Sequence, residues 1–283
     1  MNHPAVLRAP GQGITLQVAH WPGPGPNLLA VHGLTANCRS FDTIAQEIAP
    51  PVNLYAVDLR GRGLSDHPAT GYSLERHSAD LAQVITHLGQ APMMVMGHSL
   101  GAYIALALAA QHPQLVQGLI LLDGGAALTP EQWARVGAGT GTSVARLGRR
   151  HASCADYLAA IRQAAGGALS PALEEYYRYD CREYPDGFGS RIDPAHIAEE
   201  RANLSRADMA ALQAGVDCPV LILRALRPML GGDEMVLPDQ ALPALLRALP
   251  RASLVELPDQ DHFGMVFRPS PRRAQAIKAF LGL

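Results

Sequence analysis

Residues 95–101, Val95-Met96-Gly97-His98-Ser99-Leu100-Gly101, hold a Gly-x-Ser-x-Gly pentapeptide between an apolar, strand-like segment and a helix-like one. On a tight strand-to-helix turn, a serine hydroxyl stands clear of the backbone only when the residues two before and two after are nearly free of side chain. Chance alone would give about 0.1 such pentapeptides in this composition, so the motif needs support from its surroundings. The stretch predicts a nucleophilic Ser99 if the chain also supplies a base, an acid and donors for an oxyanion.

The composition bounds the class of protein. With 283 residues, 48% of them hydrophobic and 17% charged, the chain can bury a large core. The net charge of -2 gives no reason to propose nucleic acid or an anionic membrane surface as a partner. Four widely spaced cysteines without a Cys-x-x-Cys pair support neither a zinc site nor a disulfide scaffold. We expect no metal and no cofactor. No apolar stretch has the length of a secretory signal or a membrane span, and we therefore expect a cytoplasmic protein.

Short, mostly apolar runs recur along the chain, as is typical of strands covered on both faces. An alternating segment at 14–18 precedes them, and the runs lie at 28–31, 52–57, 93–96, 119–122, 220–223 and 254–257. Segments with apolar residues at helical spacing separate them, at 38–48, 74–88, 100–111, 240–249 and 271–281. Strands that alternate with helices predict a parallel α/β sheet.

The alternation stops after Gly125 and resumes at Cys218, which leaves about 90 residues with helical patterns and no convincing strand. We interpret residues 126–213 as an inserted helical cap, and residues 1–125 and 214–283 as the core. Within the cap we expect helices near 130–136, 154–165, 171–184 and 194–213, with Pro130 and Pro171 at helix starts. The cap is rich in aromatic residues, which either hold a small helical layer together or line a pocket, with Trp133, Tyr157 and Tyr176 as candidate substrate-binding residues.

Two further segments offer the partners that a nucleophilic serine needs. His262 follows the last expected strand, in a loop at a strand's carboxyl end, where open α/β sheets place their sites. It is our candidate for the base. The stretch His32-Gly33-Leu34-Thr35 follows the strand at 28–31, and the backbone amides of Leu34 and Leu100 are the candidate oxyanion donors.

These motifs together resemble the α/β-hydrolase superfamily in its capped form. The resemblance covers nearly all of the chain outside the cap and rests on His32-Gly33, the loop Asp58 to Ser65, the pentapeptide around Ser99 and Asp261-His262-Phe263. It implies an eight-stranded, mostly parallel sheet flanked by helices, with a helical cap after the sixth strand. It also implies a triad in the order nucleophile, acid, histidine. We expect the loop residues Asp58 and Arg60 to tie neighbouring loops together.

The acid of the triad is the open assignment. The resemblance implies an acid soon after the seventh strand, and Asp233 is our first choice there, with the adjacent Glu234 as an alternative. Asp123, at the end of the sixth strand, occupies the other position from which this superfamily supplies an acid.

The motifs predict acyl transfer to water: His262 deprotonates Ser99, which attacks a carbonyl, and water then releases the acyl-enzyme. We expect a carboxylesterase-like serine hydrolase acting on an ester or lactone of a small, partly apolar molecule. The alternatives are hydrolysis of an amide or of a carbon–carbon bond with the same triad, cofactor-free peroxidation, and a non-catalytic protein that binds a small ligand on this fold. Neither the substrate nor the oligomeric state follows from the sequence.

Overall fold

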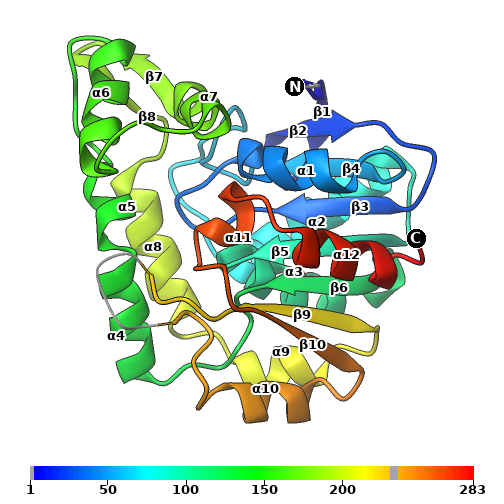
Figure 1. The fold of residues 1–283 in the computed structure, drawn as a ribbon. Helices are drawn as coiled ribbons and strands as arrows, with labels where there is room; N and C mark the ends of the chain where they lie inside the picture. Colours follow the sequence, from blue (N-terminus) through cyan, green and yellow to red (C-terminus); the bar gives the residue numbers. More distant parts are fainter. Residues whose placement is uncertain (1–2, 230–234) are drawn as a thin grey trace.

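A computed structural model describes residues 3–229 and 235–283, and its centre is one eight-stranded sheet (Figure 1). The strands lie in the order β1-β2-β4-β3-β5-β6-β9-β10. Their bounds are β1 Ala5–Pro10, β2 Thr15–Trp21, β3 Asn27–Val31, β4 Asn53–Val57, β5 Met93–His98, β6 Val116–Leu122, β9 Val220–Ala225 and β10 Ala252–Leu257. Strands β1 and β2 pair antiparallel with each other and β2 pairs antiparallel with β4, whereas every pair from β4 to β10 is parallel. The mostly parallel eight-stranded sheet implied by the resemblance is confirmed.

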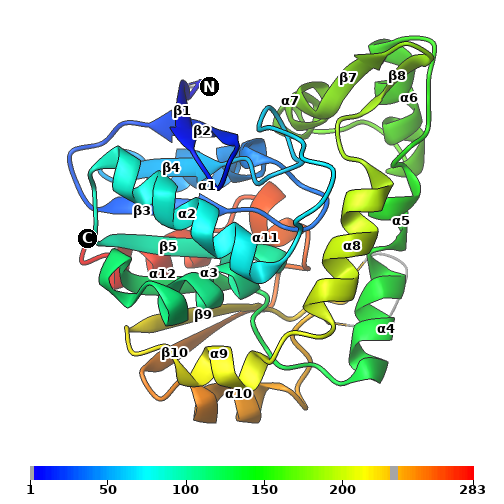
Figure 2. The ribbon, with the colours of Figure 1, turned by 180° about the vertical axis from the view of Figure 1, so that it is seen from behind.

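Helices cover both faces of the sheet, which explains why the central strands are apolar throughout. One face carries α1 (Asp42–Ile48), α11 (Gly264–Phe267) and α12 (Pro271–Phe280), together with the short 3₁₀ helix η1 (Cys38–Phe41). The other carries α2 (Leu74–Leu88), α3 (Leu100–Gln111), α9 (Met209–Ala214) and α10 (Leu242–Ala248) (Figure 2). The sheet's two faces pack into two separate apolar clusters; in the central strands Leu29 and Val95 belong to one, and Leu28 and Met96 to the other.

The segment after β6 forms a cap along one side of the sheet (Figure 1). It contains α4 (Pro130–Gly139), α5 (Gly141–Ala145), α6 (Cys154–Ala164), α7 (Pro171–Asp180) and α8 (Pro194–Leu204). The predicted starts at Pro130 and Pro171 coincide with the first residues of α4 and α7, where Thr129 and Ser170 accept hydrogen bonds from backbone amides of the first turn.

Two local expectations need correction, and the sequence pattern missed one strand. The cap holds a two-stranded antiparallel sheet, β7 (Cys181–Tyr184) with β8 (Gly187–Ser190), where the sequence pattern suggested a continuous helix up to 184. The expected helix at 194–213 is divided into α8 and α9 by a turn at 205–208. Strand β1 lies outside every predicted segment; it is an edge strand with mostly exposed side chains, so it carries no apolar signal.

The loop after β4 ties its neighbours together as expected. The Asp58 carboxylate accepts hydrogen bonds from the Cys38 amide at 2.7 Å and the Leu64 amide at 2.9 Å. Arg60 forms a buried ion pair with Asp80 on α2 at 2.7 Å. Among the described residues, no helix is both long and apolar enough to cross a membrane.

Candidate active site

Ser99 stands on a sharp turn between β5 and α3. Its backbone has a φ of 54°, a conformation that L residues adopt only at a cost in strain energy. The flanking glycines make this turn possible, because a Cβ on Gly97 would lie 2.1 Å from the carbonyl oxygen of Gly101, and one on Gly101 would lie 2.0 Å from that of Val31. The Gly-x-Ser-x-Gly spacing is therefore a steric requirement of this fold, and it leaves the Ser99 side chain at the edge of a cavity.

His262 and Asp123 form a buried hydrogen-bonded pair beside this turn. The Nδ1 atom of His262 lies 2.8 Å from Oδ2 of Asp123, and the residues are 3% and 1% exposed. Asp123 follows β6 directly, has a φ of 49°, and its other carboxylate oxygen accepts a hydrogen bond from the Ala225 amide at 3.2 Å. A carboxylate at Nδ1 leaves Nε2 of the imidazole as the atom that can take a proton from a serine.

Among the described residues, the carboxylate at His262 is thus that of Asp123, which the sequence offered as an alternative to our first choice. Asp233 and Glu234 lie outside the described residues. A histidine Nδ1 has room for one hydrogen-bond partner, and Asp123 already occupies that place.

His98, inside the pentapeptide, holds the loop that carries His262. Its Nε2 lies 2.9 Å from the backbone carbonyl oxygen of His262, and the two ring centroids are 4.7 Å apart. Burial lowers the pKa of His98 well below its ordinary value, and the nearby His262 lowers it further. His98 is therefore neutral and can donate from Nε2 to that carbonyl.

The two candidate oxyanion donors, the amides of Leu34 and Leu100, line the cavities at Ser99. Among the described residues neither amide donates to any acceptor. Both are thus free to bind a developing negative charge on a substrate oxygen.

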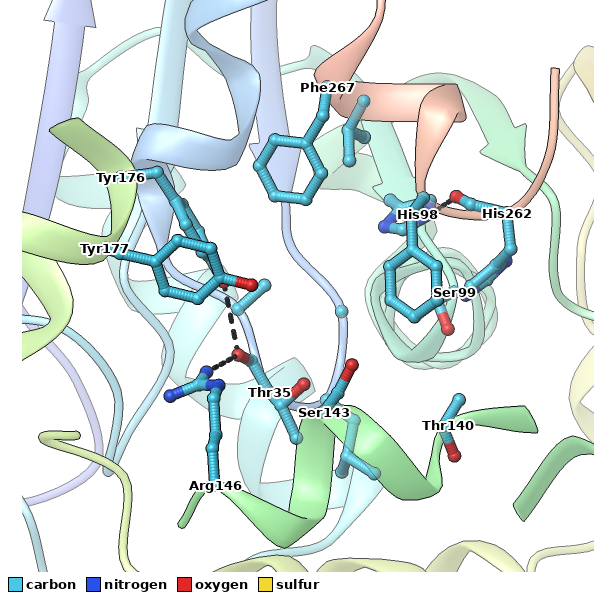
Figure 3. A pocket seen from close by; sticks show the side chains of 15 residues that line it. Thr35, His98, Ser99, Thr140, Ser143, Arg146, Tyr176, Tyr177, His262 and Phe267 are labelled. Atoms are coloured by element: carbon cyan, nitrogen blue, oxygen red, sulfur yellow. Dashed lines mark hydrogen bonds between the residues drawn. The ribbon is translucent and has the colours of Figure 1, made fainter. Parts of the chain in front are cut away.

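Two arginines hold the loop that carries the Leu34 amide. The Nε atom of Arg62 donates to the Leu34 carbonyl oxygen at 3.0 Å, and Nη2 of Arg146 donates to the Thr35 carbonyl oxygen at 2.9 Å. Tyr176 of α7 also donates to the Thr35 oxygen, at 3.2 Å (Figure 3). The Leu34 N–H shares its peptide group with the Gly33 carbonyl, which lies 2.8 Å from Nδ1 of His32 and accepts a hydrogen bond from the Ala36 amide at 3.2 Å. These contacts hold the loop, and with it the Leu34 amide, in one orientation.

Both arginines pair with carboxylates of the cap. Arg62 forms a fully buried ion pair with Glu200 of α8, which also accepts from His77 at 2.5 Å. Burial opposes ionisation of Glu200, but Arg62 and His77 outweigh it and lower its pKa to about 2. Arg146 pairs with the buried Asp180 at 2.6 Å. Nothing in the spacing of these residues distinguishes them from surface charges, so the sequence does not predict their contacts.

Two cavities meet at Ser99. The first, the His262 cavity, has a volume of about 60 Å³ and is lined by His98, His262, Phe267, Arg146, Tyr176 and Tyr177, among others. Figure 3 shows Ser99, His98 and His262 on one wall of it and Arg146, Tyr176 and Tyr177 on the facing wall. The second, the Trp133 cavity, has a volume of about 270 Å³ and lies between the start of α3, α4 and α8.

The three aromatic candidates from the cap divide accordingly. Trp133 lines the larger cavity and Tyr176 the smaller one. Tyr157 lines neither of these two cavities: it is 1% exposed and donates from its hydroxyl to Asp180 at 2.7 Å. This contact joins α6 to the end of α7, away from both cavities, and the expectation that Tyr157 binds substrate stays a prediction.

Acid should destabilise the fold because buried histidines stay neutral. Burial lowers the pKa of His32 to about 3, so between pH 6.5 and 3 this residue binds a proton in the unfolded chain and not in the folded one. Burial also lowers the pKa of His98, so this residue likewise makes the folded protein less stable as the pH falls. The free energy of unfolding then falls with decreasing pH by about 1.4 kcal/mol per pH unit for each histidine. We expect urea titrations to give a free energy of unfolding about 2 kcal/mol lower at pH 5.5 than at pH 7.5.

His87→Gln is the matched control, because His87 is an exposed residue on α2. It should leave this pH dependence unchanged, whereas His32→Gln should reduce it. A free energy of unfolding that stays constant or rises between pH 7.5 and 5.5 would contradict neutral, buried histidines.

Comparisons with known proteins agree with this architecture. A family model described as alpha/beta hydrolase fold matches residues 26–269. Over 255 residues the chain is 30% identical to the 2-(acetamidomethylene)succinate hydrolase of Mesorhizobium japonicum, which covers 88% of this chain and 86% of that protein. Over 256 residues it is 27% identical to the pimeloyl-[acyl-carrier protein] methyl ester esterase of Chromobacterium violaceum, covering 85% of this chain and 88% of the esterase.

Among solved structures, an E-2-(acetamidomethylene)succinate hydrolase superposes with a TM-score of 0.85. The match covers 99% of this chain and all of that one, at 26% sequence identity. The relatives that match along most of their length thus include a protein named for an amide-containing acid and one named for a methyl ester.

Proposed function

Because the chain belongs to the α/β-hydrolase fold family and is a hydrolase by that membership, we propose that it cleaves a carboxylic ester through an acyl-enzyme on Ser99. The observation that carries the proposal is the 2.8 Å contact between His262 and Asp123 beside the strained Ser99. Binding a ligand does not require this combination of a buried acid–histidine pair, a strained serine and two free amides, whereas acyl transfer does.

In the proposed mechanism Nε2 of His262 takes the Ser99 proton as the hydroxyl oxygen attacks the substrate carbonyl. Asp123 keeps the proton on Nδ1 and stabilises the imidazolium that forms. The amides of Leu34 and Leu100 bind the resulting oxyanion. His262 then donates its proton to the leaving group, and the same residues activate water to release the acid.

Amide hydrolysis is the second candidate, and the extended match to 2-(acetamidomethylene)succinate hydrolase favours it. The same residues would act, but an amine leaves only after protonation, so more of the barrier depends on His262.

A matched pair of substrates separates the two functions. We expect an ester to have a kcat/KM at least about 100-fold above that of the amide with the same acyl group, with both rates lost in His262→Ala. Ammonia or amine release and alcohol release measure the two rates directly. An amide turned over faster than its ester would overturn ester hydrolysis and leave the serine mechanism standing.

A further inference from the structure

The two cavities at Ser99 differ in size, lining and access to His262. Leu34, Ser99 and Thr140 line both of them, so the reacting carbonyl lies where the cavities join. His262 lines only the smaller cavity, and Leu100 only the larger. The site is therefore asymmetric about the nucleophile.

This asymmetry indicates which cavity binds the leaving group and which binds the acyl group of the substrate. His262 must reach the leaving atom to protonate it, so the leaving group lies in the His262 cavity. That cavity has a volume of only about 60 Å³, which accommodates a small alcohol or amine. The acyl chain then extends the other way, into the Trp133 cavity of about 270 Å³.

The walls of the Trp133 cavity suit an aliphatic chain. Tyr103 and Trp133 lie with ring centroids 5.5 Å apart, and Val136 and Leu204 add aliphatic surface. Burying methylene groups against such walls favours binding by about 0.8 kcal/mol for each group.

A guanidinium group stands at this cavity, that of Arg201 from α8. It lies against the backbone of α4, because a Cβ on Gly137 would come within 2.5 Å of Nη2 of Arg201. Within residues 3–229 and 235–283, no carboxylate forms an ion pair with Arg201. Arg146 in the other cavity differs: its charge is compensated by Asp180, and it donates to Thr35.

Resting on the proposed function, we infer that the substrate is a small-alcohol ester, or small-amine amide, of an aliphatic acid whose far end is anionic. The chain lies in the Trp133 cavity, a terminal carboxylate meets Arg201, and the small leaving group lies at His262. Arg201 and the cavity walls then determine which acyl groups are bound, and Ser99 carries out the bond cleavage.

The test uses the full chain and monomethyl esters of straight-chain dicarboxylic acids, with methyl esters of monocarboxylic acids of equal length as the neutral series. Methanol release gives kcat/KM. We expect the carboxylate-ended esters to be preferred at least about tenfold, since hydrogen bonds to charged groups are worth more than neutral ones.

Arg201→Gln should reduce this preference about tenfold, and Gly137→Val should reduce it equally by displacing the guanidinium group. The control is Arg206→Gln, an exposed arginine near the end of α8 that lines neither cavity, and it should leave the preference unchanged.

One further variant and one comparison of substrates test the orientation. Val136→Trp should lower the ratio of long-chain to short-chain ester turnover about tenfold, and methyl esters should exceed bulky-alcohol esters of the same acid. A preference for bulky alcohols with short acyl groups would overturn the orientation, and an unchanged preference in Arg201→Gln would overturn the carboxylate site. If the protein hydrolyses none of these esters and Ser99 takes up no phosphonate probe, it is the proposed function that fails.

Discussion

Ser99→Ala is expected to lower kcat by about 10⁵-fold, because it removes the hydroxyl oxygen that we propose forms the acyl-enzyme. The residual rate would come from the Leu34 and Leu100 amides and from binding alone. Alanine at a φ of 54° bears the same strain as serine, so the variant should unfold within a few degrees of the parent protein. Steady-state turnover of a methyl ester and thermal unfolding together measure both effects.

Ser253→Ala is the matched control, since Ser253 is an exposed residue on β10. It should keep full activity. If Ser99→Ala kept more than about a hundredth of the parental kcat while remaining folded, the covalent mechanism would be wrong.

Asp123→Asn is expected to lower kcat by about 10³- to 10⁴-fold with a small change in KM. An amide in place of the carboxylate can stabilise the wrong tautomer of His262 and cannot stabilise the imidazolium. The effect should be largest near neutral pH, where the histidine must act as a base. Pre-steady-state measurement of acylation locates the loss in the chemical step.

Asp233→Asn and Glu234→Gln test the competing assignment made from the sequence. With Asp123 bound to Nδ1 of His262, each should change kcat by less than about threefold. If Asp233→Asn lowered kcat about 10³-fold and Asp123→Asn had only a mild effect, the acid of the triad would be Asp233 in the loop after β9.

Much of the fold could be predicted because its central strands are apolar on both faces. The segments 28–31, 93–96 and 119–122 lie inside β3, β5 and β6, and the predicted helices at 74–88 and 100–111 match α2 and α3. Strand β1 could not be found in this way, since an edge strand with exposed side chains has no pattern of burial to reveal it.

The site shows the same division between local and non-local information. Ser99, Leu100 and the flanking glycines belong to one turn, and their spacing alone indicates the geometry. The acid depends on which of two loops approaches His262, and the pairing of Asp123 with His262 joins residues 139 positions apart. Tyr157 illustrates the limit for aromatic residues, because sequence does not tell a buried hydrogen-bonding tyrosine from one that faces a cavity.

Intact-protein mass spectrometry with a fluorophosphonate probe decides whether Ser99 is the nucleophile. We expect one adduct per chain, located by peptide mapping to Ser99, absent in Ser99→Ala and formed much more slowly in His262→Ala. If the protein hydrolyses esters yet takes up no probe, or takes it up at another residue, Ser99 is not the nucleophile.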